Sequence, residues 1–158
     1  MHPNEDGKTH INVYSNGRTV LGRFLSNFTK CHVQTEDGIF ASVEGYWYWL
    51  STPPNHPRRH ELTAAYGLSA KLIGKEIRDP NFNHPKFKEK IAFAITNKIL
   101  ARPDIQQLIR ANNLPYVHYY VFGSKVETPK SSAWVVEVIT QISEAIKNNA
   151  LEISPYKD

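Results

Sequence analysis

The sequence has 158 residues, of which 41% are hydrophobic and 22% charged, a composition typical of one globular domain rather than a disordered chain. No apolar run approaches the roughly 20 residues of a membrane-spanning helix and the first residues lack a signal-peptide core, so we expect no membrane association and a cytoplasmic location. The single cysteine, Cys31, excludes an intrachain disulfide and a cysteine-rich zinc site. A net charge of +4 favours anionic partners, although solubility alone also explains it, and the scattered basic residues disfavour sequence-specific DNA readout.

The first half of the chain alternates short extended segments with turns. Residues 10–15 alternate polar and apolar side chains and predict a short strand, followed by a turn at 16–18. Residues 24–28 form a short segment flanked by phenylalanines, and the sequence TEDG at 35–38 predicts a turn. A helix capped by Ser42 then runs to about residue 50, where adjacent prolines end it.

The middle of the chain is helical in pattern. Residues 61–77 predict a helix that Gly67 interrupts, with Leu68, Leu72 and Ile73 on one face. After the loop DPNFNHP, apolar side chains recur at helical spacing from residue 85 to residue 100, and Pro85 suits the first turn.

The last third predicts helix, strand and helix. A helix starts at Pro103 and ends near Asn113, with Leu108 turned inward. The β-branched and aromatic run 116–123 predicts a strand, and 124–130 a polar loop. An apolar stripe from residue 134 to residue 146 predicts a final helix.

These elements predict a compact, helix-rich α+β fold with a small β-sheet. No linker, repeat or low-complexity tract divides the chain, so we expect a single domain over residues 1–158. We expect flexible tails at about 1–9 and 152–158.

The expected helix at 43–50 contains four consecutive aromatic residues and one carboxylate. At about 100° per residue the rings of residues 46–49 surround most of the helix, so this helix is central to the core, although aromatic faces also stack nucleobases. Glu44 lies at the second helical position, where a carboxylate gains about 0.3 to 1 kcal/mol from the helix dipole. A carboxylate placed against so much apolar surface instead suggests contact with a ligand or a cation. The residues alone leave both interpretations open.

Other candidate sites are weaker. Lys71 and Lys75 lie one helical turn apart and either face phosphates together or are simply solvated. His56 and His60 are four residues apart, but Pro57 and two arginines between them disfavour a shared metal. The sequence contains neither a P-loop nor a GxGxxG fingerprint, and we expect neither a metal nor a cofactor.

Several motifs together resemble a known family. HINVYS, GRFLSNF, DGIFASVEGYW and SAKLIGK follow one another between residues 10 and 75. In this order and at this spacing they are similar to the motifs of the NADAR family, the YbiA-like N-glycosidases, and the resemblance extends over nearly the whole chain. The family implies a helix-rich α+β fold and the hydrolysis of N-glycosidic bonds in ADP-ribose-type nucleotides.

The resemblance also implies roles for particular residues. Glu44 would be the catalytic carboxylate. The substrate-binding residues would come from the SNF loop, the aromatic helix, the AKxxG motif and the last strand, namely Arg23, Phe24, Ser26, Asn27, Phe28, Tyr46, Trp47, Lys71, Gly74, Lys75, Phe122 and Gly123.

The chain departs from the family pattern at several positions, one of which is Phe122 in place of the tryptophan of the family's WGDG motif. Where the family has a histidine after the glutamate this chain has Gly45, and where it has a lysine this chain has Ser51. Ser124 replaces the acid of the family's WGDG motif, and Lys75 replaces an arginine. A mechanism that uses the lysine as a covalent nucleophile is therefore excluded here.

Three functions remain, of which the third is a nucleic-acid or protein interaction module that kept only the fold. The first is an N-glycosidase that acts on an ADP-ribose-type or ribosylated-base nucleotide, such as ADP-ribosyl-guanine or a riboflavin-pathway intermediate. The second is a catalytically inactive binder or sensor of an NAD-derived nucleotide. The expected partner is a small-molecule nucleotide or an ADP-ribosylated nucleic acid.

Overall fold

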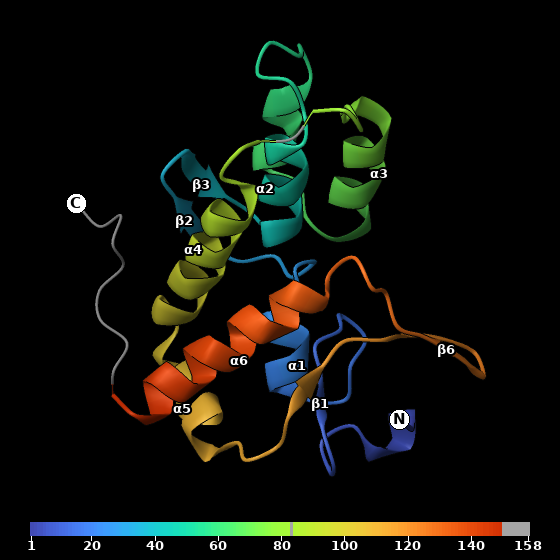
Figure 1. The fold of residues 1–158 in the computed structure, drawn as a ribbon, viewed down its shortest axis with the longest axis vertical. Helices are drawn as coiled ribbons and strands as arrows, with labels where there is room; N and C mark the ends of the chain where they lie inside the picture. Colours follow the sequence, from blue (N-terminus) through green and yellow to red (C-terminus); the bar gives the residue numbers. More distant parts are fainter. Residues whose placement is uncertain (83, 150–158) are drawn as a thin grey trace. The chain divides into compact units, whose positions relative to one another are not determined.

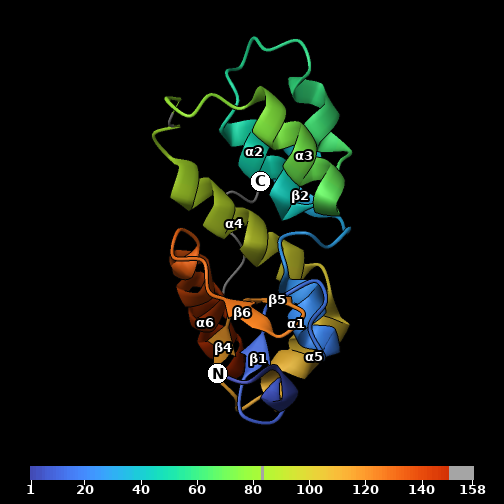
Figure 2. The ribbon, with the colours of Figure 1, turned by 90° about the vertical axis from the view of Figure 1, so that its right-hand side faces the viewer.

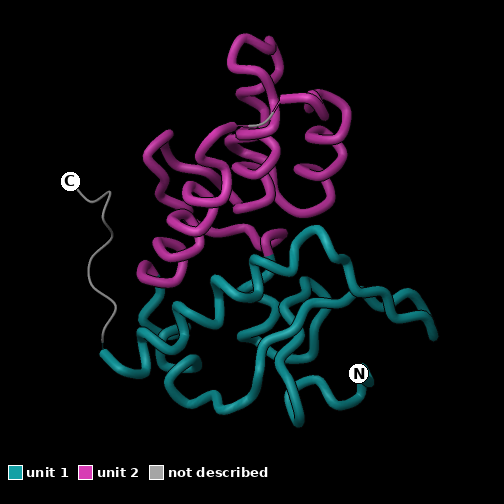
Figure 3. The backbone as a smooth tube through the Cα atoms, in the orientation of Figure 1, with its two compact units in different colours: residues 1–26, 102–152 teal, residues 27–101, 153–158 magenta. Residues whose placement is uncertain are grey.

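The structure, a computed structural model, describes residues 1–82 and 84–149, so the expected tail at 152–158 lies outside the described residues. The chain divides into two compact units, shown in different colours in Figure 3. Of the described residues, one unit contains 1–26 and 102–149, and the other contains 27–82 and 84–101. Each has its own helices, strands and buried side chains, and a single domain over the whole chain stays a prediction.

The unit of residues 27–101 is mainly helical (Figure 1). Its elements are β2 (Val33–Thr35), β3 (Gly38–Phe40), α2 (Val43–Leu50), the 3-10 turn η2 (Arg59–Thr63), α3 (Gly67–Ile77) and α4 (Phe87–Leu100). The two strands form an antiparallel hairpin around the expected turn, where Gly38 has a φ of 116°. Helix α2 contacts α3, α4 and η2, and α3 runs beside it in both views (Figures 1 and 2). The aromatic helix is therefore central to this unit, as its composition predicts.

The expected helix at 61–77 is two elements. Of its predicted apolar face, Ile73 packs against the core as expected, but the prediction is wrong for the two leucines. Helix α3 begins at Gly67, which has a φ of 57°. Leu68 and Leu72 are 60% and 59% exposed, while Ala70 and Gly74 are fully buried. Small residues face α2 because the two helices approach too closely for leucines to fit between them.

The other unit surrounds a pair of helices from the C-terminal third of the chain. Its elements are η1 (Pro3–Glu5), β1 (Ile11–Asn12), α1 (Val20–Leu25), α5 (Pro103–Ala111), β4 (Tyr116–Val117), β5 (Tyr120–Phe122), β6 (Lys125–Glu127) and α6 (Ala133–Lys147). Strand β1 pairs with β4 in parallel, and β5 and β6 form an antiparallel hairpin. Helix α5 packs on α6 and on α1, and isoleucines of α5 and α6 form much of the core. Leu108, expected to point inward, is 40% exposed.

The strand expected at 116–123 is interrupted because a side chain replaces its backbone partner. The side-chain oxygen of Asn12 accepts the N–H of Tyr119, and the side-chain nitrogen of Asn12 donates to the Tyr119 carbonyl oxygen, both at 3.0 Å. His118 in turn donates from Nδ1 to the carbonyl oxygen of Val13 at 2.6 Å. These bonds end the pairing of β1 with β4 after two residues.

Three further segments differ from expectation. Residues 20–25 form helix α1, capped by Thr19, although the sequence predicted no helix there. Strand β6 lies within the expected loop 124–130. In the region expected to be an N-terminal tail, the buried carboxylate of Asp6 accepts the N–H groups of Asn12 and Arg18 at 2.9 and 2.8 Å, which joins the first residues to β1.

Candidate functional site

Three segments distant in sequence converge at the start of α2. The N–H of Glu44 donates to the carbonyl oxygen of Asn27 at 2.9 Å. The N–H of Gly67, the first residue of α3, donates to the carbonyl oxygen of Phe28 at 2.9 Å. The end of the SNF motif thus connects the first turn of α2 with the first turn of α3. This brings together Asn27, Phe28 and Glu44, as the family resemblance implies.

The first turn of α2 is fixed by a buried serine and a glycine. Ser42 accepts the N–H of Gly45 at 2.9 Å and donates its hydroxyl to the carbonyl oxygen of Ala65 at 2.8 Å. A Cβ on Gly45 would lie 2.4 Å from the carbonyl oxygen of Leu62. A side chain at position 45 therefore has no room, which gives a physical reason for the glycine that stands here in place of the family's histidine.

Gly74 allows α3 to pack directly against α2. A Cβ at this position would lie 2.0 Å from the ring of Tyr48. Tyr48 itself packs in a buried cluster with Leu62 and Ile77. The structure places Gly74 beneath a tyrosine ring in the helix interface, so its contribution to substrate binding stays a prediction.

Glu44 faces two lysines without contacting them. Its side chain is half-buried, and burial raises the pKa of Glu44 to about 7, although the positive charges of Lys71 and Lys75 oppose this increase. Among the described residues no hydrogen bond or ion pair holds its carboxylate. Helix α3 thus brings two cations near a carboxylic acid that is uncompensated by direct bonds, an arrangement that favours a functional site.

Asn27 provides a second sign of an incomplete site. Its side-chain oxygen Oδ1 is buried and has no hydrogen-bond partner in the part of the chain that the structure describes. Buried polar atoms nearly always have a partner, so an orphaned acceptor needs an explanation. Because the backbone of Asn27 is bonded to Glu44, the unsatisfied oxygen belongs to the same local site.

The aromatic residues of α2 have different surroundings. Tyr46 is fully buried, and its hydroxyl donates to Asp37 Oδ2 at 2.6 Å, so it offers no exposed surface to a ligand in this structure. Trp47 is half-buried and meets the ring of Phe87 edge-on, with the ring centroids 4.9 Å apart. Of these two residues, only Trp47 has the exposure that stacking on a ligand requires.

The remaining predicted site residues belong to the other unit, and their role in binding stays a prediction. Arg23 is exposed, and its side chain donates to the carbonyl oxygen of Gly17 at 2.9 Å. Phe24 and Ser26 are buried. Phe122 is 56% exposed, and Gly123, with a φ of 61°, forms the turn between β5 and β6.

A second carboxylate of the same unit, Asp37, is fully engaged. It accepts from Tyr46 and, at 2.9 Å, from Nζ of Lys90, which also binds Glu36 at 2.6 Å. Although burial raises the pKa of Asp37, these hydrogen bonds and the charge of Lys90 lower it below its usual value. Asp37 is therefore ionised at neutral pH, and its hydrogen bonds give it a structural role. Glu127, an acid near Ser124 in the sequence, is exposed on β6.

Lys98 is a buried amine that sequence reasoning missed. Burial lowers the pKa of Lys98 to about 8, opposed by the neighbouring Cys31. Its position four residues after Ala94 and three after Ile95 places it on the apolar stripe of α4, so the helical period was the signal available in the sequence.

Comparison with known proteins identifies the fold. This chain is similar to the NMR structure of the Escherichia coli protein YbiA, with a TM-score of 0.65. The similarity covers 95% of this chain and 92% of the YbiA chain. The chain has the fold of YbiA. This confirms the expected helix-rich α+β fold class, while the sequence identity to YbiA is only 14%. No family model and no curated protein sequence matches the chain.

Two kinds of feature, a membrane-spanning helix and a cluster of metal-binding side chains, are absent from the described residues. No helix among residues 1–82 and 84–149 has the length and apolar character needed to cross a bilayer. Nor do three metal-binding side chains of His, Cys, Asp or Glu cluster anywhere in these ranges. The α2–α3 site therefore offers the chemistry of a carboxyl group, two ammonium groups and an amide.

Proposed function

We propose that the chain is a hydrolase that cleaves the N-glycosidic bond of an ADP-ribose-type or ribosylated-base nucleotide, with Glu44 as the essential acid. The observation that carries the proposal is the carboxyl group of Glu44, whose pKa is raised to about 7 beside Lys71 and Lys75 and which no direct bond from residues 1–82 or 84–149 neutralises. A carboxyl group that exchanges its proton near neutral pH suits general acid or base catalysis. The fold shared with YbiA is consistent with this function.

The chemistry of the bond requires such a group. Cleavage of a ribosyl C–N bond develops positive charge on the anomeric carbon and negative charge on the departing base. In its protonated form Glu44 donates a proton to the base, and in its ionised form it stabilises the oxocarbenium ion or accepts a proton from the attacking water. One carboxyl group near half-ionisation supplies both forms at neutral pH.

The neighbouring residues supply binding groups for the rest of the substrate. Lys71 and Lys75 carry the charge that a pyrophosphate requires. The orphaned Oδ1 of Asn27 accepts a hydrogen bond from a ribose hydroxyl or from an N–H of the base. Trp47 has a partly exposed ring for stacking.

Hydrolysis here proceeds by direct attack of water. Ser51, at the position of the family's lysine, donates its hydroxyl to the carbonyl oxygen of Trp47 at 2.9 Å at the end of α2. A hydroxyl is not an amine, so Ser51 forms no covalent intermediate of the lysine type.

The alternative function is binding without turnover. It is favoured by the same Ser51 and by Ser124, which leave the chain without two functional groups that the family pattern contains. In this function Lys71, Lys75 and Asn27 retain a nucleotide such as NAD or ADP-ribose, and Glu44 contributes only to binding.

The deciding experiment measures binding and cleavage together. Purified protein is incubated with NAD, ADP-ribose, DNA carrying ADP-ribosyl-guanine and ribosylamino-pyrimidine riboflavin precursors, and released base is measured by mass spectrometry beside the thermal shift. We expect one of them to be cleaved by wild type and by Glu89→Gln, a matched change of an exposed first-turn glutamate on α4, but not by Glu44→Gln. A thermal shift with all ligands recovered intact establishes binding without turnover. Cleavage by Glu44→Gln at the wild-type rate contradicts the assignment of Glu44 as the essential acid.

The pH profile of cleavage then distinguishes the two roles of Glu44. If the protonated form acts, kcat/KM falls as the pH rises above about 7. If the ionised form acts, kcat/KM falls below the same value. The proposal requires the pH profile of kcat/KM to have one limb near this pKa. A Glu44→Asp variant should react slowly and have a carboxyl group with a different pKa, so its profile should lack the limb at this pH.

A further inference from the structure

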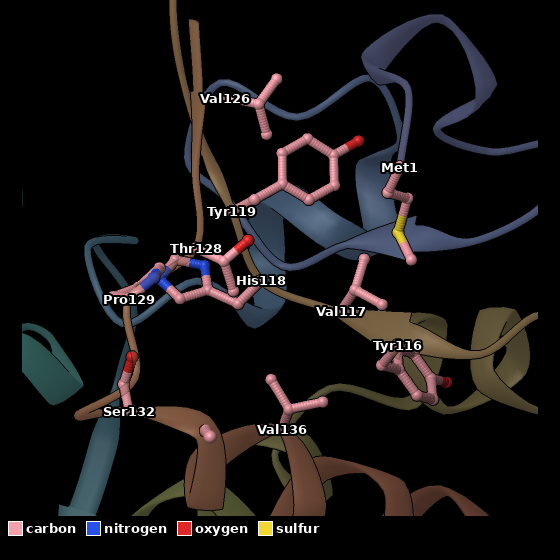
Figure 4. Close-up of a pocket in the computed structure, with 11 residues that line it drawn as sticks. Met1, Tyr116, Val117, His118, Tyr119, Val126, Thr128, Pro129, Ser132 and Val136 are labelled. Carbon is pink, nitrogen blue, oxygen red and sulfur yellow. The ribbon is translucent and has the colours of Figure 1, made fainter.

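A cavity lies wholly within the unit formed by residues 1–26 and 102–149, and the proposed function does not use it. Its volume is about 310 Å³. Figure 4 shows side chains from the β4–β5 segment, the β6 strand and the start of α6 around it. This volume lies at the lower end of the range typical of sites for small ligands, roughly 300 to 1,000 Å³.

The walls of this cavity are mainly apolar. Val117 and Tyr119 come from the β4–β5 segment, Val126 from β6, and Ala133 and Val136 from the first turns of α6. Tyr119 is buried, and its hydroxyl is bound to Nε2 of His10 at 2.6 Å. The ring of Tyr119 is therefore held in place while its polar atom is already satisfied, which makes the wall it forms apolar.

His118 is one of three polar side chains that line the cavity, beside Thr128 and Ser132 (Figure 4), and its surroundings fix its tautomer. Its Nδ1 lies 2.6 Å from the carbonyl oxygen of Val13, and because a carbonyl oxygen only accepts, Nδ1 carries the proton. Burial lowers the pKa of His118 below its usual value, so the ring is neutral at physiological pH. Its Nε2 is then an acceptor. Among the described residues it has no partner, and it is not sealed from solvent.

The ring of His118 is also held from the side. Tyr120 meets it edge-on, with the ring centroids 4.9 Å apart. The backbone hydrogen bond and this contact together orient Nε2 before any ligand arrives, which reduces the entropy lost on binding.

We propose that this cavity binds a flat, mostly apolar heterocycle that donates a ring N–H to Nε2 of His118. The apolar walls provide affinity by excluding water from the ring faces, and Nε2 of His118, an acceptor held in one orientation, selects a ligand with a ring N–H. The cavity volume admits one or two fused rings, the size of an indole or a purine base.

The test compares two probes of almost the same shape. Indole carries a ring N–H and benzofuran carries an oxygen at that position. Each is titrated into the full-length protein labelled with ¹⁵N, and binding is measured from the shifts of the Val117, His118 and Val136 amides. We expect indole to bind about threefold to tenfold more tightly than benzofuran, the range that one hydrogen bond contributes.

Two variants make the result specific to this cavity. Ala133→Trp fills the cavity from an exposed position on α6 and should abolish binding of both probes, whereas Ser131→Trp, exposed but outside the lining, should not. His118→Asn retains a donor for the Val13 carbonyl but lacks the distant acceptor, so it should bind indole and benzofuran equally. If Ala133→Trp disturbs the amide spectrum as a whole, Val126→Trp blocks the opposite wall from another exposed position.

Defined outcomes overturn the proposal. Absence of saturable shifts with indole, or binding that survives both blocking variants, shows that the cavity is not the binding site. Equal affinity of wild type for the two probes shows that His118 does not select the N–H. Because Glu44→Gln should leave indole binding unchanged, failure here is distinguishable from failure of the proposed hydrolase function.

Discussion

Two carboxyl groups of the same unit, Glu44 and Asp37, both lie near lysines and yet differ in ionisation. Asp37 accepts hydrogen bonds from Tyr46 and Lys90, and its pKa lies below its usual value. Glu44 experiences two lysine charges without a direct bond, and its pKa is raised to about 7. Direct hydrogen bonds outweigh the cost of burial at Asp37, whereas charges without contact do not outweigh it at Glu44. The difference separates an acid that holds the fold together from one that is free to transfer protons.

The largest effect should come from removing the close helix contact that places the lysines. Gly74→Ala puts a methyl group within 2.0 Å of the Tyr48 ring, so α3 must move away from α2. We expect a loss of about 3 kcal/mol or more in the free energy of unfolding, measured by urea denaturation. Ser69→Ala on the exposed side of α3 is the control and should have little effect. A loss below about 1 kcal/mol in Gly74→Ala would contradict this packing.

Asp37→Asn should be the next largest change. It removes the negative charge that partners the buried Lys90 and weakens the hydrogen bond that the buried Tyr46 hydroxyl donates, while Glu36 remains bonded to Lys90. We expect a loss of about 2 to 3 kcal/mol at pH 7, measured by urea denaturation. Asp104→Asn breaks an exposed ion pair with Arg102 and should leave the urea midpoint unchanged. An unchanged midpoint in Asp37→Asn would remove the contrast between the two carboxylates.

Glu44→Gln, in contrast, should increase the free energy of unfolding, and only at high pH. The folded-state pKa of about 7 exceeds the ordinary value of 4.5, so the folded protein binds the proton more tightly and loses stability as the pH rises through this interval. At pH 8 the glutamine variant should therefore be more stable than wild type by about 1 to 2 kcal/mol, allowing for solvent screening. At pH 4 the two should be equal. Urea denaturation at both values tests the difference, and a destabilised variant at pH 8 would show that Glu44 is held by a stabilising bond.

The smallest effect should appear in the titration of Glu44 itself. Because Lys71 and Lys75 favour its ionised form, the double variant Lys71→Ala/Lys75→Ala should raise the pKa of Glu44 above about 7 by a fraction of a unit. Carbon-detected NMR titration of the Glu44 carboxyl group measures this value. Lys86→Ala, an exposed lysine of the same unit, is the control. A lower pKa in the double variant would contradict the electrostatic arrangement.

Local signals in the sequence predicted much of the unit that contains Glu44. Ser42 caps α2 as expected because a cap depends only on the next three residues. The turn at Gly38 and the apolar period of α4 are similarly local. The position of Glu44 in the first turn of α2 was therefore correctly predicted, and so was the fold class.

The errors arose where distant residues compete with local preference. The strand expected at 116–123 breaks because the side chain of Asn12, more than a hundred residues earlier, takes the hydrogen bonds of Tyr119. The exposed leucines of α3 were assigned to a core face because helical spacing does not show how closely a neighbouring helix approaches. Only the tertiary structure revealed that Gly74 faces that neighbour.

The sequence by itself determined which groups are available: a carboxylate at a helix start, two lysines one turn apart and an aromatic helix that must be central. The tertiary structure decided which partners these groups have and at what pH they ionise. It left Glu44 near Lys71 and Lys75 without a bond, and it paired Asp37 with Lys90, which is 53 residues away in the chain. Ionisation depends on burial and on the distances between atoms, and both are properties of packing that residue order does not contain.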